Sequence, residues 1–488
     1  MMMKNFFKTF FGISFFCCSV FFNGCKPDIS AESVPVSVPL DSLQQAFLDL
    51  RFGMFIHYNM PTYSIHDWPD PNMAAELFSP TQLDCNQWAD AALSAGMTYG
   101  CLTTKHHSGF CIWNTQTTDY HVGNTPYGKD VVRQYVDAFR SRGLKVFLYY
   151  SILDLHHNIR SGWANNQDHL NFIKNQLTEL LTQYGEITCL VIDGWDADWS
   201  RISYDDISFT EIYRHIKSLQ PNCLVSEHNA GKYPGAALFY TDVKHYEQNA
   251  GQIISKETNK LPAQSGIPIN KNWFWKRSFL TDSVVSAETI VFDNLIPLNE
   301  AHCNFILNVA PNPAGLIDDN VLEELSRVGK LWSHEGKAEL LPEKQHPLIY
   351  PNLAKYARMN SSWSLGKRTS DLASDDDFST VWVGQQAVNK HFLEIELEGE
   401  HEFNAVCFVE STDTLRYPSQ INSRVNSYDI SYMSNGKWNQ LAVENTDRLV
   451  RIHRFKPVKG SKVRVDFDGC APGFGISEIM LYNENIIN

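Results

Sequence analysis

Short apolar runs alternate with amphipathic stretches from Asp41 to about Glu343. Apolar runs of strand length bounded by Gly or polar residues are typical of strands buried on both faces of a parallel sheet. Seven strands are predicted on this basis: Phe52–His57, Tyr99–Lys105, Lys145–Ser151, Cys189–Asp193, Cys223–Glu227, Ala237–Asp242 and Asn304–Val309.

Between these runs, apolar residues recur at the spacing of one helix face. The four patterns contain Trp88, Ala91, Ala92 and Ala95; Val132, Tyr135, Val136 and Phe139; Leu170, Ile173, Leu177, Leu180 and Leu181; and Ile212, Ile216 and Leu219. Gly96 and Gly143 fall where helix C-caps belong. No Gly-x-Gly-x-x-Gly follows the first strand, which argues against a dinucleotide-binding fold. The alternation therefore predicts an α/β fold, a (β/α)8-like TIM barrel over residues 41–345.

The pattern changes after about Pro347, where strands of period two alternate with polar turns. The predicted strands are His391–Glu398, Ala405–Glu410, Asn426–Tyr432, Gly460–Asp466 and Ile476–Tyr482. This pattern predicts an all-β sandwich of the jelly-roll type over residues 346–488.

Residues 1–25 have the features of a signal peptide. Lys4 and Lys8 precede an apolar run, Phe10–Phe22, that is too short to span a membrane comfortably. The run ends in Phe-Asn-Gly-Cys25, which resembles a lipoprotein lipobox with Cys25 as the lipidated residue; ordinary signal cleavage is the alternative. Residues 26–40, rich in Pro and Ser, are expected to form a linker. We expect an exported protein, periplasmic or at the cell surface, that meets a membrane only through a lipid anchor at Cys25.

Composition excludes some function classes. The formal net charge of -14 argues against a nucleic-acid partner, which needs a basic face. The eight cysteines after Cys25 are scattered without Cys-x-x-Cys spacing, which favours buried free thiols over disulfides and indicates no structural zinc site.

Polar residues suited to catalysis or ligand binding lie at the ends of the predicted strands. Asp193 ends the run Cys189–Asp193, and barrel enzymes carry their catalytic groups at such positions. His57 ends the first predicted strand, and the pair His106-His107 directly follows the second. Because neighbouring strand residues point to opposite faces, one histidine of the pair is expected to face the barrel interior and the other to support the loop. Candidate platforms for a sugar ring are Trp68, Trp195 and Trp275, with burial in the core as the alternative for each.

Several of these segments resemble glycoside hydrolase family 29, the α-L-fucosidases. The resemblance runs from about residue 43 to 335 and is carried by Phe52–His57, Leu102–Phe110, Val191–Trp195, Trp273–Trp275 and Phe305–Pro311. The last two segments resemble the branch that prefers α-1,3/1,4-fucosyl linkages. The segments Asp375–Trp382, Phe392–Leu397 and Val463–Asp466 are similar to the discoidin-type domain of carbohydrate-binding modules.

The resemblance implies a retaining exo-glycosidase that needs no metal or organic cofactor and releases terminal α-L-fucose from a fucosylated oligosaccharide or glycoconjugate. Asp193 matches the family nucleophile. His57, His106, His107 and Trp195 match pocket positions around the sugar.

The second carboxyl group is less clearly marked. In the ungapped alignment of Asp242–Gly251 with the family pattern, the acid/base Glu falls on Asn249. Glu247 lies two residues earlier, on the same side of an extended segment, and is the predicted acid/base. Glu227 is the second choice, and an absent acid is a third alternative.

Two departures from the family pattern concern substrate selection: Ser108 and the stretch His66–Trp68, where acidic residues are usual. They leave open a related glycosidase for another sugar such as α-L-galactose. Asn249 at the acid/base position leaves open a catalytically impaired glycan-binding lipoprotein.

Overall fold

The computed structural model describes residues 37–484 except 65, 161–166, 196–199, 201, 203–205, 229–240, 248–253, 258, 260, 335, 343–346, 348–350, 378–379, 412–422 and 446–448. The predicted signal peptide and most of the predicted linker lie outside the described residues, and so does Asn249.

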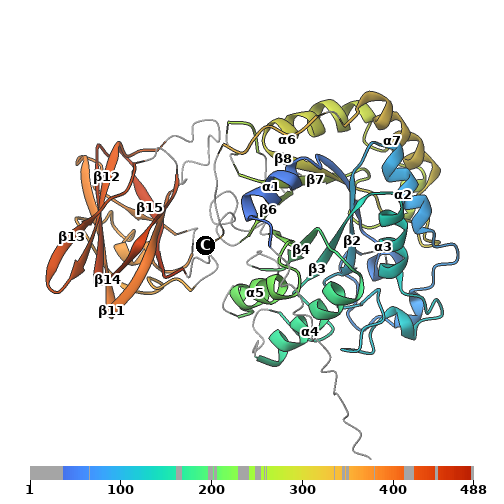
Figure 1. Ribbon diagram of the computed structural model, residues 1–488, viewed down its shortest axis with the longest axis horizontal. Helices are drawn as coiled ribbons and strands as arrows, with labels where there is room; N and C mark the ends of the chain where they lie inside the picture. The colour runs from blue at the N-terminus through green and yellow to red at the C-terminus, as the bar shows by residue number, and fades with distance from the viewer. Residues whose placement is uncertain are drawn as a thin grey trace, which may run out of the picture. The chain divides into compact units, whose positions relative to one another are not determined.

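Eight parallel strands close into a barrel in chain order, from β1 to β8 and back to β1 (Figure 1). The strands are β1 Phe52–Ile56, β2 Tyr99–Lys105, β3 Lys145–Ser151, β4 Cys189–Asp193, β5 Leu224–His228, β6 Val243–Glu247, β7 Ala263–Pro268 and β8 Cys303–Asn308. The predicted TIM barrel is confirmed.

Helices connect the barrel strands. The α-helices are α1 Leu40–Leu48, α2 Cys85–Ser94, α3 Val131–Ser141, α4 Gln167–Gln183, α5 Phe209–Leu219, α6 Ile296–Glu300 and α7 Asp319–Leu331. Short 3-10 turns are η1 Met60–Tyr63, η2 Ala75–Leu77, η3 Val122–Asn124, η6 Arg277–Leu280 and η8 Ser370–Ala373, and η7 Thr289–Leu295 is a π-helix. Asp84 and Asp130 cap the amino ends of α2 and α3 with side-chain hydrogen bonds. Gly96 and Gly143 adopt positive φ just past the carboxyl ends of these helices, where C-cap glycines were predicted.

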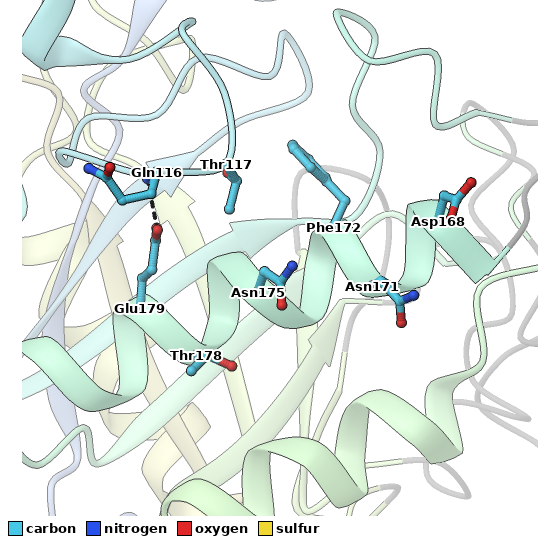
Figure 2. Close-up of a pocket in the computed structure, with 8 residues that line it drawn as sticks. All are labelled: Gln116, Thr117, Asp168, Asn171, Phe172, Asn175, Thr178 and Glu179. Atoms are coloured by element: carbon cyan, nitrogen blue, oxygen red, sulfur yellow. Dashed lines mark hydrogen bonds between the residues drawn. The ribbon is translucent and has the colours of Figure 1, made fainter.

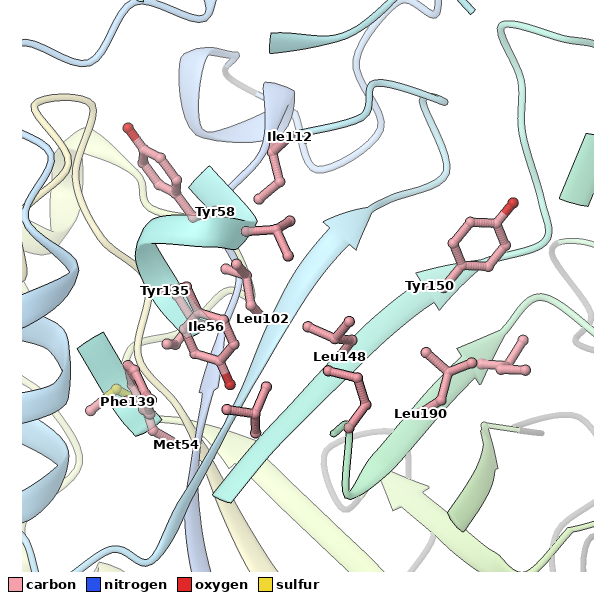
Figure 3. Close-up of a cluster of buried hydrophobic side chains, with 14 of the residues drawn as sticks. Met54, Ile56, Tyr58, Leu102, Ile112, Tyr135, Phe139, Leu148, Tyr150 and Leu190 are labelled. Atoms are coloured by element: carbon pink, nitrogen blue, oxygen red, sulfur yellow. The ribbon is translucent and has the colours of Figure 1, made fainter. Parts of the chain in front are cut away.

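The barrel has an inner and an outer core, and β4 illustrates how one strand supplies both. Cys189 and Val191 lie in the inner cluster, whereas Leu190 and Ile192 lie in the outer cluster. Figure 3 shows Leu190 in the outer cluster, which also contains Tyr135 and Phe139 of α3. The period-two alternation places Asp193, two residues beyond Val191, on the inner side at the carboxyl end of the barrel. The sequence pattern thus fixes the direction of this carboxylate.

Two barrel strands differ from prediction. The predicted sixth strand, Ala237–Asp242, is wrong at its carboxyl end, because Thr241 and Asp242 precede β6. Residues 237–240 lie outside the described residues. β7 was not predicted. Both strands carry polar or small residues, Val-Lys-His-Tyr-Glu in β6 and Ala-Gln-Ser-Gly-Ile-Pro in β7. Their apolar content is too low to signal a buried strand.

The C-terminal region forms a seven-stranded antiparallel β domain with its own core. Its strands are β9 Arg358–Ser361, β10 Trp382–Val383, β11 Lys390–Glu410, β12 Ser427–Ser434, β13 Lys437–Leu441, β14 Val450–Asp468 and β15 Gly475–Tyr482. The runs His391–Glu398 and Ala405–Glu410, predicted as separate strands, join through a register shift into the single long strand β11. The predicted all-β class is confirmed.

All eight cysteines in the described part of the chain are buried free thiols, as expected. No helix among the described residues is both long enough and apolar enough for a membrane span.

Candidate active site

The carboxyl ends of the barrel strands converge on a cluster of polar side chains. Tyr149 comes from β3, Asp193 from β4, His228 from β5 and Glu247 from β6. Because all eight strands are parallel, these ends meet at one mouth of the barrel, where barrel enzymes carry their active sites.

Asp193 is buried and held by donors on both of its oxygens. The Tyr149 hydroxyl donates to Oδ2 at 2.7 Å, and Nδ1 of His228 lies 3.1 Å from Oδ1. Nε2 of His107 approaches Oδ2 at 3.8 Å. These contacts orient the carboxylate and stabilise its ionised form.

Glu247, the predicted acid/base, lies in the same cluster. Its Oε1 accepts a hydrogen bond of 2.9 Å from the indole nitrogen of Trp273, and its Oε2 lies 3.3 Å from Nε2 of His228. One imidazole ring therefore stands between the two carboxylates and contacts each through a different nitrogen.

The pKa values of this group are set by burial and by mutual charge. Burial by itself raises the pKa of Asp193, but His228, His107 and Tyr149 together bring it well below its usual range. Burial also opposes the charge of His228, yet Asp193 and Glu247 raise the pKa of His228 to about 10. The pKa of Glu247 is lowered: burial and Asp193 raise it, and His228 and Trp273 more than compensate. At neutral pH the cluster therefore holds two carboxylates around one imidazolium.

The three predicted pocket histidines, His57, His106 and His107, lie together beside the cluster and are called the histidine wall. His57 is fixed by Nδ1 contacting Asn308 Oδ1 at 2.7 Å, and His107 by Nδ1 contacting Ser151 Oγ at 2.7 Å. Burial lowers the pKa of His57 to about 3 and that of His107 to about 4. These neutral imidazoles are suited to hydrogen bonding with sugar hydroxyls, each nitrogen donating or accepting.

The expectation that only one residue of the pair His106-His107 faces the interior is wrong. Their rings lie 3.9 Å apart, and His106 also lies 5.8 Å from the ring of Tyr149. A register irregularity between Thr103 and Lys105 interrupts the alternation of β2, and the strand ends at Lys105. Strand alternation no longer applies to the histidines beyond it.

The predicted tryptophans separate into different places. Trp68, 44% exposed, lies with its ring 4.6 Å from that of His107, at the rim of the site. Trp195 is fully buried in the outer core, where its indole nitrogen donates to the carbonyl of Ile207 at 2.8 Å. Trp275 is half-buried and donates to Asp318 Oδ2 at 2.7 Å, before α7. Of the three, the structure brings only Trp68 to the histidine wall.

Glu227, the second choice for the acid/base, lies on the wrong side of β5. Leu224 belongs to the inner cluster and Val225 to the outer cluster, so alternation directs His228 inward and Glu227 outward. The charge of Glu227 acts on Lys244 of β6, which is also buried.

A buried ion pair supports the loops beneath the histidines. Lys105 Nζ lies 2.9 Å from Asp154 Oδ2 and donates to the Tyr150 hydroxyl at 3.0 Å. Asp154 Oδ1 in turn contacts Nδ1 of His157 at 2.8 Å. The pair ties the end of β2 to the loop after β3, and both loops lead into the site.

No role was predicted for Tyr149, His228 or Phe274, and Trp273 was singled out only as a member of the family-like segment Trp273–Trp275 and as a possible ring platform. His228 could have been found from its place at the end of a buried strand, directly after Glu227. Tyr149 offered little signal, because an aromatic residue inside an apolar strand is typical of a core. Phe274 lies 4.8 Å from the ring of His106, and Trp273 lies 5.0 Å from that of His57, so this segment covers the histidine wall.

A separate hollow of about 520 Å³ lies on α4 and the loop containing Gln116 and Thr117 (Figure 2). Its Glu179 accepts hydrogen bonds of 2.8 Å from the backbone nitrogen of Gln116 and from the indole of Trp113. None of the predicted site residues lines it.

Comparison with known proteins shows the family to which the barrel region belongs. Residues 32–337 match the family model described as Alpha-L-fucosidase. The chain belongs to the alpha-L-fucosidase family. Residues 357–481 of this family member match the F5/8 type C domain, in agreement with the predicted discoidin-like region.

Similar proteins extend over most of this fucosidase family member. It is 26% identical to alpha-L-fucosidase 1 of Arabidopsis thaliana over 464 residues. The alignment covers 87% of this chain and 83% of the relative. Tissue alpha-L-fucosidase of Bos taurus is 25% identical over 306 residues, covering 59% of this chain and 60% of the relative.

Solved structures share the fold. Alpha-L-fucosidase isoenzyme 1 from Paenibacillus thiaminolyticus aligns with a TM-score of 0.53 at 22% identity, over 88% of this chain and 99% of that one. A variant of a Ruminococcus gnavus GH29 fucosidase, in complex with fucose, aligns with a TM-score of 0.50 at 19% identity, over 92% and 95%.

Proposed function

We propose that this protein is a retaining exo-glycosidase that releases terminal α-L-fucose from glycans by double displacement. The observation that carries the proposal is the pair of carboxylates, Asp193 and Glu247, held at the barrel mouth by one imidazole ring. Retaining glycosidases use two carboxyl groups in this way, one as nucleophile and one as acid/base.

In the first step, Asp193 attacks the anomeric carbon while Glu247 protonates the leaving glycosidic oxygen. The low pKa of Asp193 keeps it ionised, as a nucleophile requires. In the second step, Glu247 removes a proton from water, and that water releases the sugar from Asp193. Each carboxylate thus returns to its starting state after one turnover.

The histidine wall suits a sugar with several hydroxyl groups. His57 and His107 are each oriented through Nδ1, and Nε2 of His107 points toward Asp193. Among the described residues, no group bonds the buried Nδ1 of His106. The exposed Trp68 provides an apolar ring face at the rim. The family relationship and the fucose bound by the Ruminococcus relative favour fucose as the sugar.

The nucleophile is tested by incubation with 2-deoxy-2-fluoro-fucosyl fluoride, followed by mass spectrometry of the peptides. A fucosyl adduct on Asp193 is expected, because the fluorine slows release of the covalent intermediate. An adduct on another residue contradicts the assignment of Asp193. Absence of any adduct, together with turnover of an α-L-galactoside, favours the related sugar.

The acid/base is tested with Glu247→Ala. The variant is expected to lose most activity on substrates with poor leaving groups, by roughly 10²–10⁴-fold, and to regain turnover of activated aryl fucosides in azide. Glu227→Gln is the matched control, because that carboxylate faces away from the site. An unaffected rate in Glu247→Ala excludes Glu247.

We also propose a preference for α-1,3/1,4-linked fucose. Support comes from the sequence segments Trp273–Trp275 and Leu307–Pro311, of which Trp273 contacts Glu247 directly. Hydrolysis rates on α-1,3- and α-1,4-fucosylated trisaccharides, compared with an α-1,2-fucosylated one, test this preference. Faster release from the α-1,2 linkage contradicts it.

Finally, we propose that the protein is exported and lipid-anchored at Cys25, in the periplasm or at the cell surface. The sequence of residues 1–25 supports this proposal. Metabolic labelling with an alkyne fatty acid should mark the wild type and not Cys25→Ala. Labelling of both variants, or of neither, contradicts the anchor.

A further inference from the structure

His228 occupies an unusual position between the two reacting groups. Its Nδ1 lies 3.1 Å from Asp193 Oδ1 and its Nε2 lies 3.3 Å from Glu247 Oε2. The ring is buried at the end of β5, between β4 and β6, so the two carboxylates reach it from the two neighbouring strands. Both nitrogens are committed to the catalytic pair.

The charged and titratable groups around His228 favour its protonated form. Asp193 of β4 and Glu247 of β6 are anionic, and both attract the proton. His245 of β6 lies 5.1 Å away and is neutral, since burial lowers its pKa to about 3; His107 after β2 is neutral as well. Lys244 adds a cation on the outer side of β6, near Glu227.

This arrangement raises a question about the acid step. The Glu247 carboxyl must be protonated when it protonates the leaving oxygen, yet its pKa is lowered by the hydrogen bond and charge of His228. At neutral pH the proton that the reaction needs is therefore on the imidazole and not on the carboxylate.

We propose that His228 is a positioning residue that stores, between the two carboxylates, the proton that Glu247 delivers to the leaving oxygen. The proposal rests on the proposed retaining mechanism and adds a residue to it. His228 acts through Glu247 and Asp193 and does not itself contact the reacting carbon.

One proton moves from His228 to Glu247 and back during each turnover. The imidazolium carries one proton on Nδ1, directed at Asp193, and one on Nε2, directed at Glu247. The Nε2 proton passes to Glu247 Oε2, which leaves a neutral ring that still donates its Nδ1 proton to Asp193. Glu247 then gives this proton to the glycosidic oxygen as the bond to the leaving group breaks. When Glu247 later takes a proton from water, that proton returns to Nε2.

The same geometry couples proton delivery to nucleophilic attack. As Asp193 bonds to the anomeric carbon, its negative charge is lost. One of the two anions that hold the proton on His228 disappears, so the pKa of His228 falls. The proton then moves toward Glu247 in the step in which Glu247 must supply one.

The pH dependence of kcat/KM tests the proposal, with an unactivated fucoside that needs leaving-group protonation. In the wild type, the alkaline limb should follow loss of the His228 proton and lie well above the ordinary range of a glutamate. In His228→Gln, the alkaline limb should move down by at least about one pH unit, because Glu247 must then hold its proton alone. His215→Gln, the same exchange on the outer helix α5, should leave the limb in place.

A merely structural role gives a different result. Gln reproduces a donor near Nε2, and Asn reproduces one near Nδ1, but neither carries a transferable proton. Both His228→Gln and His228→Asn should therefore lose the alkaline activity. If His228→Gln lowers the rate equally at every pH, or leaves the profile unchanged, the proposal is overturned.

A second measurement does not depend on turnover. The nitrogen resonances of the full-length protein, labelled on histidine, report the protonation of each ring, and His228→Gln identifies the His228 signal. At about pH 8, where an ordinary histidine of pKa about 6.5 is neutral, His228 should still carry both protons. It should lose one in Asp193→Asn and in Glu247→Gln. A neutral His228 at this pH in the wild type overturns the proposal, whereas failure of the adduct experiment on Asp193 overturns the proposed function instead.

Discussion

The Tyr149 hydroxyl donates a hydrogen bond of 2.7 Å to Asp193 Oδ2, on the side of the carboxylate opposite the His228 contact. Burial and the charge of Asp193 raise the pKa of Tyr149 well above its usual range, so this hydroxyl remains a donor at any working pH. The bond stabilises the ionised carboxylate and orients it.

Removal of this donor is expected to weaken the nucleophile. In Tyr149→Phe the pKa of Asp193 should rise, because a hydrogen bond to the ionised form is lost. Hydrogen bonds to charged groups contribute about 1.5–3 kcal/mol, so kcat/KM should fall by roughly 10–100-fold. The acidic limb of the pH profile should move to higher pH. Fucoside hydrolysis across the acid range provides the measurement, and an unmoved acidic limb contradicts this role.

The protonated His228 should also appear in the pH dependence of stability. Its folded-state pKa of about 10 lies above the ordinary value of 6.5, so its contribution is complete below about pH 6.5 and is lost as pH rises toward 10. The difference in unfolding free energy between the wild type and His228→Gln should therefore shrink by about 2–3 kcal/mol between about pH 7 and about pH 9. Denaturant titrations at the two pH values measure it. A constant difference means that His228 is neutral in the folded protein.

The buried pair of Lys105 and Asp154 gives a third prediction. Both side chains are completely buried, and the amine is 2.9 Å from the carboxylate. Lys105→Met leaves Asp154 without its charge partner and should cost about 3–5 kcal/mol of unfolding free energy. Combining Lys105→Met with Asp154→Leu should recover much of this loss, because no uncompensated charge then remains. A double variant as unstable as the single one contradicts this account of the pair.

The β domain contains a carboxyl group that should be neutral at pH 7. Burial and the nearby charges of Asp376 and Asp375 raise the pKa of Glu478 to about 9, while the backbone nitrogen of Asp376 donates to its Oε1 at 2.6 Å. A raised carboxyl pKa destabilises the fold as pH rises from about 4.5 toward 9. Glu478→Gln removes this titration and should make stability less dependent on pH in that interval. Unfolding curves at about pH 5 and about pH 8 measure the change, and an unchanged pH dependence means that Glu478 is ionised in the fold.

The fold and the direction of Asp193 could be predicted from the sequence, whereas Glu247 was chosen over Glu227 from a family pattern and not from strand alternation. The runs Tyr99–Lys105, Lys145–Ser151 and Cys189–Asp193 match β2, β3 and β4 residue for residue. Their apolar residues on both faces satisfy the two cores of the barrel, and alternation from Val191 already directs Asp193 inward. Helix ends marked by Gly96 and Gly143 followed from local backbone preference alone.

Other features depended on tertiary structure. The sequence contained both Glu227 and Glu247, but only strand registration directs Glu247 into the site and Glu227 away from it. β6 was not predicted because its inward residues His245 and Glu247 are polar. A strand that contributes polar side chains to a site lacks the apolar pattern by which buried strands are predicted.

The proposed catalytic cluster depends on contacts between strands. Hydrophobic periodicity along the chain determined the barrel and the direction of Asp193, because burial acts on each strand separately. The contact of His228 with both carboxylates joins the ends of three strands that are distant in sequence. Only closure of the barrel brings them within hydrogen-bonding distance, and these contacts together with burial determine their pKa values.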